Sequence, residues 1–110
     1  MTDPPSPHRP MVEVLYFDGC PNYEALVSRL PDLLAHAEVK AEVRLRRVES
    51  EEDATRARFL GSPTVRVDGR DVEPGADGRA DYGLKCRLYR SAGGIVGVPP
   101  DTLIVHALDT

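Results

Sequence analysis

The chain has 110 residues, of which 29% are charged, and its formal net charge at pH 7 is -4. This length suits one domain with a single modest hydrophobic core. Basic and acidic residues are interspersed along most of the sequence, so charge gives no reason to expect nucleic acid or an anionic membrane as a partner. We therefore expect one soluble domain with neither of these partners.

The sequence also bears on the compartment. No apolar stretch approaches the ~20 residues that cross a bilayer, and the first residues lack the charged-then-apolar order of a secretory signal. We expect a cytoplasmic protein. Its two cysteines, Cys20 and Cys86, are too few for a disulfide framework in a reducing compartment. Their expected roles are thiol chemistry or simple burial.

The N-terminal third predicts an arm, a strand and a helix. Residues 1–10 include four prolines and are interpreted as a disordered, Pro-rich arm that precedes a domain over residues 11–110. The apolar run MVEVLYF, residues 11–17, predicts a central strand. Pro21 suits the first turn of a helix, whose apolar stripe is made by Ala25, Leu26, Leu30, Leu33, Leu34 and Ala37. We expect Pro31, inside this pattern, to bend the helix.

The middle of the chain predicts a strand, a short helix and a hairpin. Alternation in residues 41–48 indicates a strand with one face nearer solvent. Ser50 and Asp53 form a possible capping box for a short helix that ends at Gly61. Asp68-Gly69 is a strong hairpin turn, so the strands on either side of it should pair antiparallel.

The C-terminal part predicts a long loop and a closing helix. Residues 74–97 are loop-like and carry six glycines. Residues 99–110 begin with two prolines and then place apolar residues on one side, as a helix would. A right-handed crossover makes the first two strands parallel, and the third can then run antiparallel to the first. The sequence predicts an α/β fold with a four-stranded mixed sheet, in the order βαβ-α-ββα, with helices on both faces.

Three motifs carry a resemblance to a known family. YFDGCPNY stands at the first strand–helix junction, GSPTVRVDG follows about forty residues later, and YGLKCRLYR comes after the hairpin. With this element order, the chain resembles the thioredoxin-like superfamily. It is most similar to a group of short actinobacterial-type thioredoxin-like proteins that are often labelled organomercurial-lyase-like. No set of residues in the chain reproduces the site of that lyase.

The resemblance implies roles for particular residues. Cys20 matches the attacking cysteine at the start of the first helix, and Pro63 matches a proline that takes a cis bond facing that cysteine. Tyr23 occupies the place of the usual resolving cysteine, so dithiol exchange within the motif is not expected. Ser62 and Thr64, on either side of Pro63, and Tyr23 are the implied substrate-binding residues.

The residues themselves also support a reactive Cys20. The free N–H groups at the start of a helix favour a thiolate, whereas the nearby carboxylate of Asp18 opposes it. We expect a sulfur that is ionisable and reachable by solvent. The alternative is that Cys20 is a small buried residue packed beside Phe17.

Cys86 has three open interpretations. Strand direction places the loop after the hairpin at the same edge as Cys20, so Cys86 can act as a remote resolving thiol. The two sulfurs can instead hold a soft metal ion, or Cys86 can be a buried residue that supports Leu84 and Leu88. Arg87 can hold a thiolate or an anionic substrate group, or it is a solvated or paired surface residue.

The leading functional hypothesis is thiol–disulfide exchange through Cys20, with Cys86 as a possible resolving cysteine and a protein or small-molecule thiol or disulfide as substrate. The first alternative is a soft-metal or organomercurial binding module without turnover. The second is a redox-inactive domain used for protein contacts. We expect no cofactor, and the three histidines lack the spacing of a zinc site.

Overall fold

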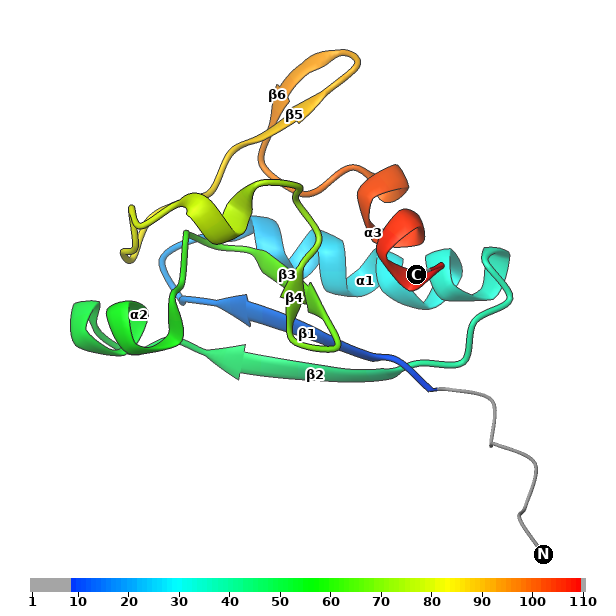
Figure 1. Cartoon of the computed structure of the whole chain (residues 1–110), viewed down its shortest axis with the longest axis horizontal. Helices are drawn as coiled ribbons and strands as arrows, with labels where there is room; N and C mark the ends of the chain where they lie inside the picture. Colours follow the sequence, from blue (N-terminus) through cyan, green and yellow to red (C-terminus); the bar gives the residue numbers. More distant parts are fainter. Residues whose placement is uncertain (1–8, 110) are drawn as a thin grey trace, which may run out of the picture.

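The computed structural model describes residues 9–109, which form one mixed α/β unit (Figure 1). Its elements alternate between strands and helices in the predicted order, followed by a small hairpin and the closing helix. They are β1 (Met11–Tyr16), α1 (Asn22–His36), β2 (Glu42–Arg47), α2 (Glu51–Ala57), β3 (Thr64–Val67), β4 (Arg70–Asp71), the 3-10 turn η1 (Ala76–Gly78), β5 (Tyr89–Ser91), β6 (Gly94–Val96) and α3 (Asp101–Leu108).

The main sheet has four strands in the order β2-β1-β3-β4. β1 pairs in parallel with β2 and antiparallel with β3, so it is central, and β4 pairs antiparallel with β3. The predicted four-stranded mixed sheet is therefore confirmed. Its topology brings three chain segments to the edge of the sheet at which β1 ends. These segments are the end of β1, the start of β3 and the chain that leaves β4.

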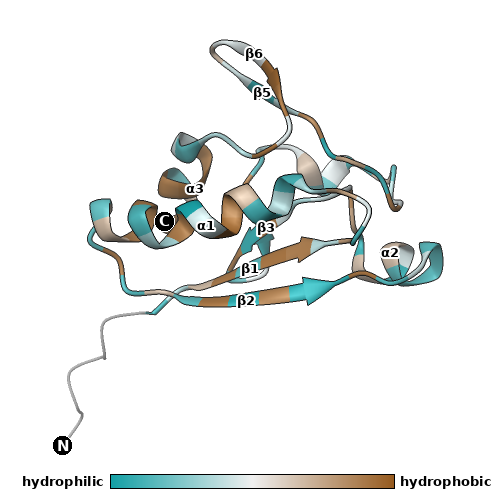
Figure 2. Ribbon diagram, turned by 180° about the vertical axis from the view of Figure 1, so that it is seen from behind, coloured by the Kyte–Doolittle hydropathy of each residue, from teal (hydrophilic) through white to brown (hydrophobic). Residues whose placement is uncertain are grey.

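The helices cover the two faces of the sheet unequally. Val12 and Val14 of β1 point to one face, where they pack with Leu26 and Leu30 of α1 and Ile104 of α3 in the main core. Leu15 points to the other face and packs against Ala54 and Ala57 of α2 in a smaller cluster. Figure 1 shows α1 and α3 side by side and α2 at the far end of β2, and Figure 2 shows the apolar stretches of β1, α1 and α3.

β2 is the exposed edge of the sheet. All six of its residues are exposed, including Val43 and Leu45, although these two share a face with the core residues of β1. Three arginines, at positions 44, 46 and 47, lie on this strand. Charged side chains on an edge strand discourage pairing with another chain.

Local signals in the sequence account for two element boundaries. The Ser50 hydroxyl accepts a hydrogen bond from the amide of Asp53 at 3.0 Å, which confirms the N-terminal cap of α2. Asp68 and Gly69 both have positive φ, at 51° and 84°, as the predicted two-residue turn requires. α2 ends at Ala57, however, and not at Gly61, because Arg58 adopts the left-handed conformation.

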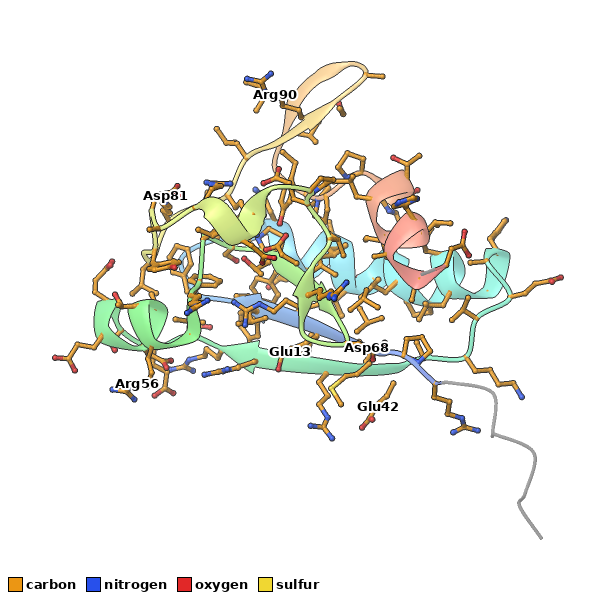
Figure 3. The ribbon with its side chains drawn as sticks, in the orientation of Figure 1. Glu13, Glu42, Arg56, Asp68, Asp81 and Arg90 are labelled. Atoms are coloured by element: carbon orange, nitrogen blue, oxygen red, sulfur yellow. The ribbon has the colours of Figure 1, made fainter. Side chains whose placement is uncertain are left out.

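Two other expectations differ from the structure. The segment 74–97 is not only a loop, because β5 and β6 form an antiparallel hairpin that projects from the body of the molecule (Figure 1). Figure 3 shows Arg90 on this hairpin pointing away from the body. Residues 1–8 of the predicted arm lie outside the described residues, whereas Pro10 is buried and its carbonyl accepts a hydrogen bond from Glu42.

No helix within residues 9–109 combines the length and the apolar character that crossing a bilayer requires.

Candidate functional site

Cys20 lies in the turn that joins β1 to α1. Its amide donates to the carbonyl of Phe17 at 3.3 Å, and Pro21 caps α1 immediately after it. A Cβ atom at Gly19 would lie 2.5 Å from the ring of Phe17, so any larger residue at that position would require the Phe17 side chain to shift. The turn therefore holds Cys20 directly in front of the helix, as the sequence predicts.

Cys86 is held beside Ser62 by the backbone. The amide of Ser62 donates to the carbonyl of Lys85 at 2.8 Å, and the amide of Arg87 donates to the carbonyl of Ser62 at 2.9 Å, which makes a parallel bridge between residues 62 and 86. Ser62 comes just before β3, and its bond to Pro63 is cis, as expected. Backbone pairing thus fixes Cys86 at the edge of the sheet where Cys20 lies.

The structure brings the two sulfur atoms together. Cys86 Sγ donates to Cys20 Sγ at 2.9 Å, and Cys20 Sγ donates to the carbonyl oxygen of Ser62 at 3.5 Å. The two residues are 66 positions apart in the chain. Both thiols are free, and strand direction alone had placed Cys86 at this edge.

The exposure of the two cysteines differs from expectation. Cys20 is fully buried, with 0% of its surface exposed, whereas Cys86 is exposed. The expectation that solvent reaches the sulfur of Cys20 is therefore wrong. The sulfur of Cys20 contacts Cys86 Sγ and the carbonyl oxygen of Ser62, and Cys86 is the exposed residue of the pair.

Cys86 is not an acidified thiol. Its hydrogen bond to Cys20, together with burial and the charge of Cys20, raises the pKa of the Cys86 thiol above its ordinary value. The neighbouring cation Lys85 is already paired with Asp81 at 2.9 Å. At neutral pH Cys86 is accordingly protonated in most molecules.

Two further residues near Cys20 have partners of their own. Asp18 forms an ion pair with Arg47 at 3.3 Å, so its charge is partly balanced before it can act on the sulfur. Tyr23, in the first turn of α1, stacks on Tyr16 with ring centroids 4.1 Å apart. Burial, with smaller effects from Glu24 and other neighbours, raises the pKa of Tyr23. Tyr23 is half-buried.

Arg87 is an internal cation. Its side chain is 0% exposed and makes two hydrogen bonds to the carboxylate of Asp71, at 2.7 and 3.0 Å, and one to Glu73 at 3.1 Å. Burial alone lowers the pKa of Arg87, but hydrogen bonds to these two acids outweigh it and the net pKa is raised. The interpretation of Arg87 as a surface residue is wrong.

The same guanidinium ties the Cys86 segment to β3. Arg87 donates to the hydroxyl of Thr64 at 3.1 Å and lies 4.6 Å from the centroid of the Tyr89 ring. The Tyr89 hydroxyl in turn donates to the carbonyl of Pro63 at 2.5 Å. Ser62, Pro63 and Thr64 are all buried. In this conformation they support the thiol pair from inside, and they do not line an open surface.

One buried hydroxyl in this support has no partner. Within residues 9–109, Ser62 Oγ is buried without a hydrogen bond, and so is Nε of Arg87. A buried polar group that is left unpaired costs about 1–3 kcal/mol. By contrast, Thr64 Oγ1 donates to the carbonyl of Gly61 at 2.7 Å.

Gly61 is required by close packing at this edge. Its φ is +127°, and a Cβ atom there would lie 2.9 Å from Cβ of Arg87. An L side chain is therefore disfavoured both by backbone conformation and by space. Glycine at position 61 lets the Cys86 segment approach the chain just before β3.

Sequence reasoning missed the residues that hold Arg87. Asp71 and Glu73 lie outside the three motifs, Tyr89 lies in YGLKCRLYR without an assigned role, and the contacts of all three depend on the tertiary fold. No signal in the sequence indicated their role, because arginine is rarely buried. In the structure, Cys86 and Leu88 are exposed while Arg87 and Tyr89 are buried. This period of two is the pattern of an extended segment with one inward face.

A separate cavity has Asp71 among its lining residues. It has a volume of about 160 Å³, and its lining includes Arg58, Arg66, Arg79 and Tyr82 but neither cysteine. Within the described part of the chain, no three His, Cys, Asp or Glu side chains gather as a metal site would require. The thiol pair is therefore the arrangement in this fold with the clearest chemistry.

No family model matches the chain, and no curated protein and no solved structure matches it either.

Proposed function

We propose that this protein has a thioredoxin-like fold and carries out thiol–disulfide exchange through Cys20 and Cys86. The observation that carries the proposal is the 2.9 Å approach of the two sulfur atoms, one of which is exposed. The strand order β2-β1-β3-β4 and the position of Cys20 before α1 support it. The substrate is a disulfide on a protein or a small molecule.

The two sulfurs need little movement to form a bond. A disulfide bond is about 2.0 Å long, so the atoms must approach by roughly 1 Å. The bridge between residues 62 and 86 already holds the backbone in place. The protein can therefore give two electrons to a substrate disulfide and keep them as an internal Cys20–Cys86 bond, which a dithiol reductant then opens.

Glutathione disulfide tests this proposal. Incubated with the reduced protein, it should produce an internal Cys20–Cys86 disulfide, detected by mass spectrometry as a loss of two hydrogen atoms. In the chain-entropy model, closing this loop adds about 4 kcal/mol to the free energy of unfolding. The Cys20→Ser/Cys86→Ser double variant is the control. A wild-type protein that stays a dithiol under these conditions contradicts the proposal.

A second candidate function follows from the same pair of sulfurs. Adjacent thiolates are the ligands that soft metal ions prefer, so the pair also suits the capture of a mercuric or organomercurial ion without turnover. Titration with mercuric ion in the reduced state separates the two functions. Binding of one equivalent, lost in either single cysteine variant and without any disulfide exchange, would favour this second function.

A further inference from the structure

The exposure of the two thiols decides which of them can meet a substrate. Cys20 is 0% exposed, so a disulfide larger than water cannot reach its sulfur in this conformation. Cys86 is exposed and lies on the outward side of an extended segment whose inward residues are Arg87 and Tyr89. An attacking sulfur must touch the disulfide that it cleaves. Access is therefore possible at Cys86 only.

We propose that Cys86 is the attacking cysteine and Cys20 the resolving one. In the family that the sequence resembles, the cysteine at the start of the first helix attacks, so the roles are reversed here. This inference rests on the proposed function. Cys86, in the YGLKCRLYR segment, makes the first contact with the substrate, and Cys20, in the FDGCPNY motif, carries out the second step.

The proposed reduction of a substrate disulfide has two steps. Cys86 loses its proton and attacks one sulfur of the substrate disulfide, which forms a mixed disulfide at Cys86 and releases the first substrate thiol. Cys20 then loses its proton and attacks Cys86 Sγ, which forms the internal disulfide and releases the second thiol. The two protons end on the two released thiols, and the two electrons have passed from the protein to the substrate.

The position of Cys20 suits the second step. Its sulfur lies 2.9 Å from Cys86 Sγ, so its attack is intramolecular and requires no diffusion. Its proton is directed at the carbonyl oxygen of Ser62, which can only accept, and a sulfur lone pair is consequently left facing Cys86. Burial also protects Cys20 from reaction with solutes before a mixed disulfide has formed.

Pulse labelling of the reduced wild-type protein tests the order directly. A brief exposure to iodoacetamide, followed by unfolding and labelling with an isotopically heavy form, measures both cysteines in one sample. We expect Cys86 to be labelled at least tenfold faster than Cys20 in the folded protein, and this ratio to become much smaller in the unfolded protein. Labelling of Cys20 as fast as Cys86 in the folded protein would overturn the inference.

Trapping of the mixed disulfide tests the chemical roles. With glutathione disulfide, Cys20→Ser should accumulate one glutathione at Cys86, because nothing resolves the adduct, and Cys86→Ser should stay unmodified over the same time. Cys20→Ala serves as a second variant if serine disturbs the buried position. Accumulation at Cys20 in Cys86→Ser, with an internal disulfide in the wild type, refutes the order alone. An absence of any adduct or internal disulfide refutes the exchange function itself.

Discussion

Arg87 and Asp71 form a buried pair in which the guanidinium makes two hydrogen bonds to the carboxylate, at 2.7 and 3.0 Å. Charge-assisted, two-point pairs of this kind fix geometry as well as charge. Because Arg87 follows Cys86 directly, this pair anchors the segment that carries the accessible thiol. It links the stability of the fold to the position of one sulfur atom.

Removal of Arg87 should destabilise the protein strongly. Arg87→Ala removes the fully buried partner of Asp71, while Glu73 keeps its ion pair with Arg79. Breaking a buried pair costs about 3–5 kcal/mol, and the partial exposure of Asp71 favours the lower end. Urea unfolding followed by circular dichroism measures the change. Arg44→Ala is the control, since its pair with Glu42 is more than half exposed on both sides and should contribute less than about 1 kcal/mol. Equal losses in both variants would contradict the internal role of Arg87.

The hydroxyl groups on either side of Pro63 should respond in opposite directions to removal. Ser62 Oγ is buried without a partner, so Ser62→Ala should raise the free energy of unfolding by about 1 kcal/mol. Thr64→Val removes a hydroxyl that bonds Gly61 and Arg87, and it should lower that energy by about 1–3 kcal/mol. Both side chains are fully buried, so the comparison is matched. A loss of stability in Ser62→Ala would indicate a partner for its hydroxyl.

Stability should fall at alkaline pH because of Tyr89. Burial is the main cause that raises the pKa of Tyr89, with Arg87 acting in the opposite direction. Tyrosine in an unfolded chain loses its proton near pH 10, while folded Tyr89 keeps its own. The contribution of Tyr89 to the free energy of unfolding is thus complete below about pH 10. Above that pH it declines by at most about 1.4 kcal/mol per pH unit. Tyr89→Phe should show a shallower decline in urea unfolding between pH 9 and 11, and an unchanged slope would refute this.

The alkylation rate of Cys86 should depend on Cys20. The hydrogen bond to Cys20 is the main cause that raises the pKa of the Cys86 thiol, so its rate of reaction with iodoacetamide should reach half its maximum above the ordinary value of about 8.5. In Cys20→Ala the midpoint should move down towards that value. A stopped-flow pH profile of both proteins measures the shift. Identical midpoints would show that Cys20 does not restrain the Cys86 proton.

Much of the architecture could be predicted because its signals are local or follow from chain direction. The apolar run of β1, the turn at Asp68-Gly69 and the cap at Ser50 each depend on a few neighbouring residues. Strand direction predicted that the loop carrying Cys86 lies at the same edge as Cys20, since the ends of β1 and β4 and the start of β3 share that edge. The contact between the two sulfurs was one of three open interpretations.

The remaining features depend on packing that no local pattern records. The sulfur of the buried Cys20 contacts Cys86, which lies 66 positions later in the chain. The acidic partners of Arg87 are Asp71, in the two-residue strand β4, and Glu73, in the loop that follows it, and both lie outside the three motifs. The β5–β6 hairpin is short, and its glycines at positions 93 and 94 were interpreted as part of a long loop.

Main-chain pairing keeps residue 86 in register with residue 62, and the Arg87–Asp71 pair anchors the same segment. The reduced and bonded forms of the proposed dithiol would then share nearly the same outline, differing by two hydrogen atoms at one rim. A partner that responds to the redox state of this protein would then have to recognise it at Cys86, the exposed residue of the pair.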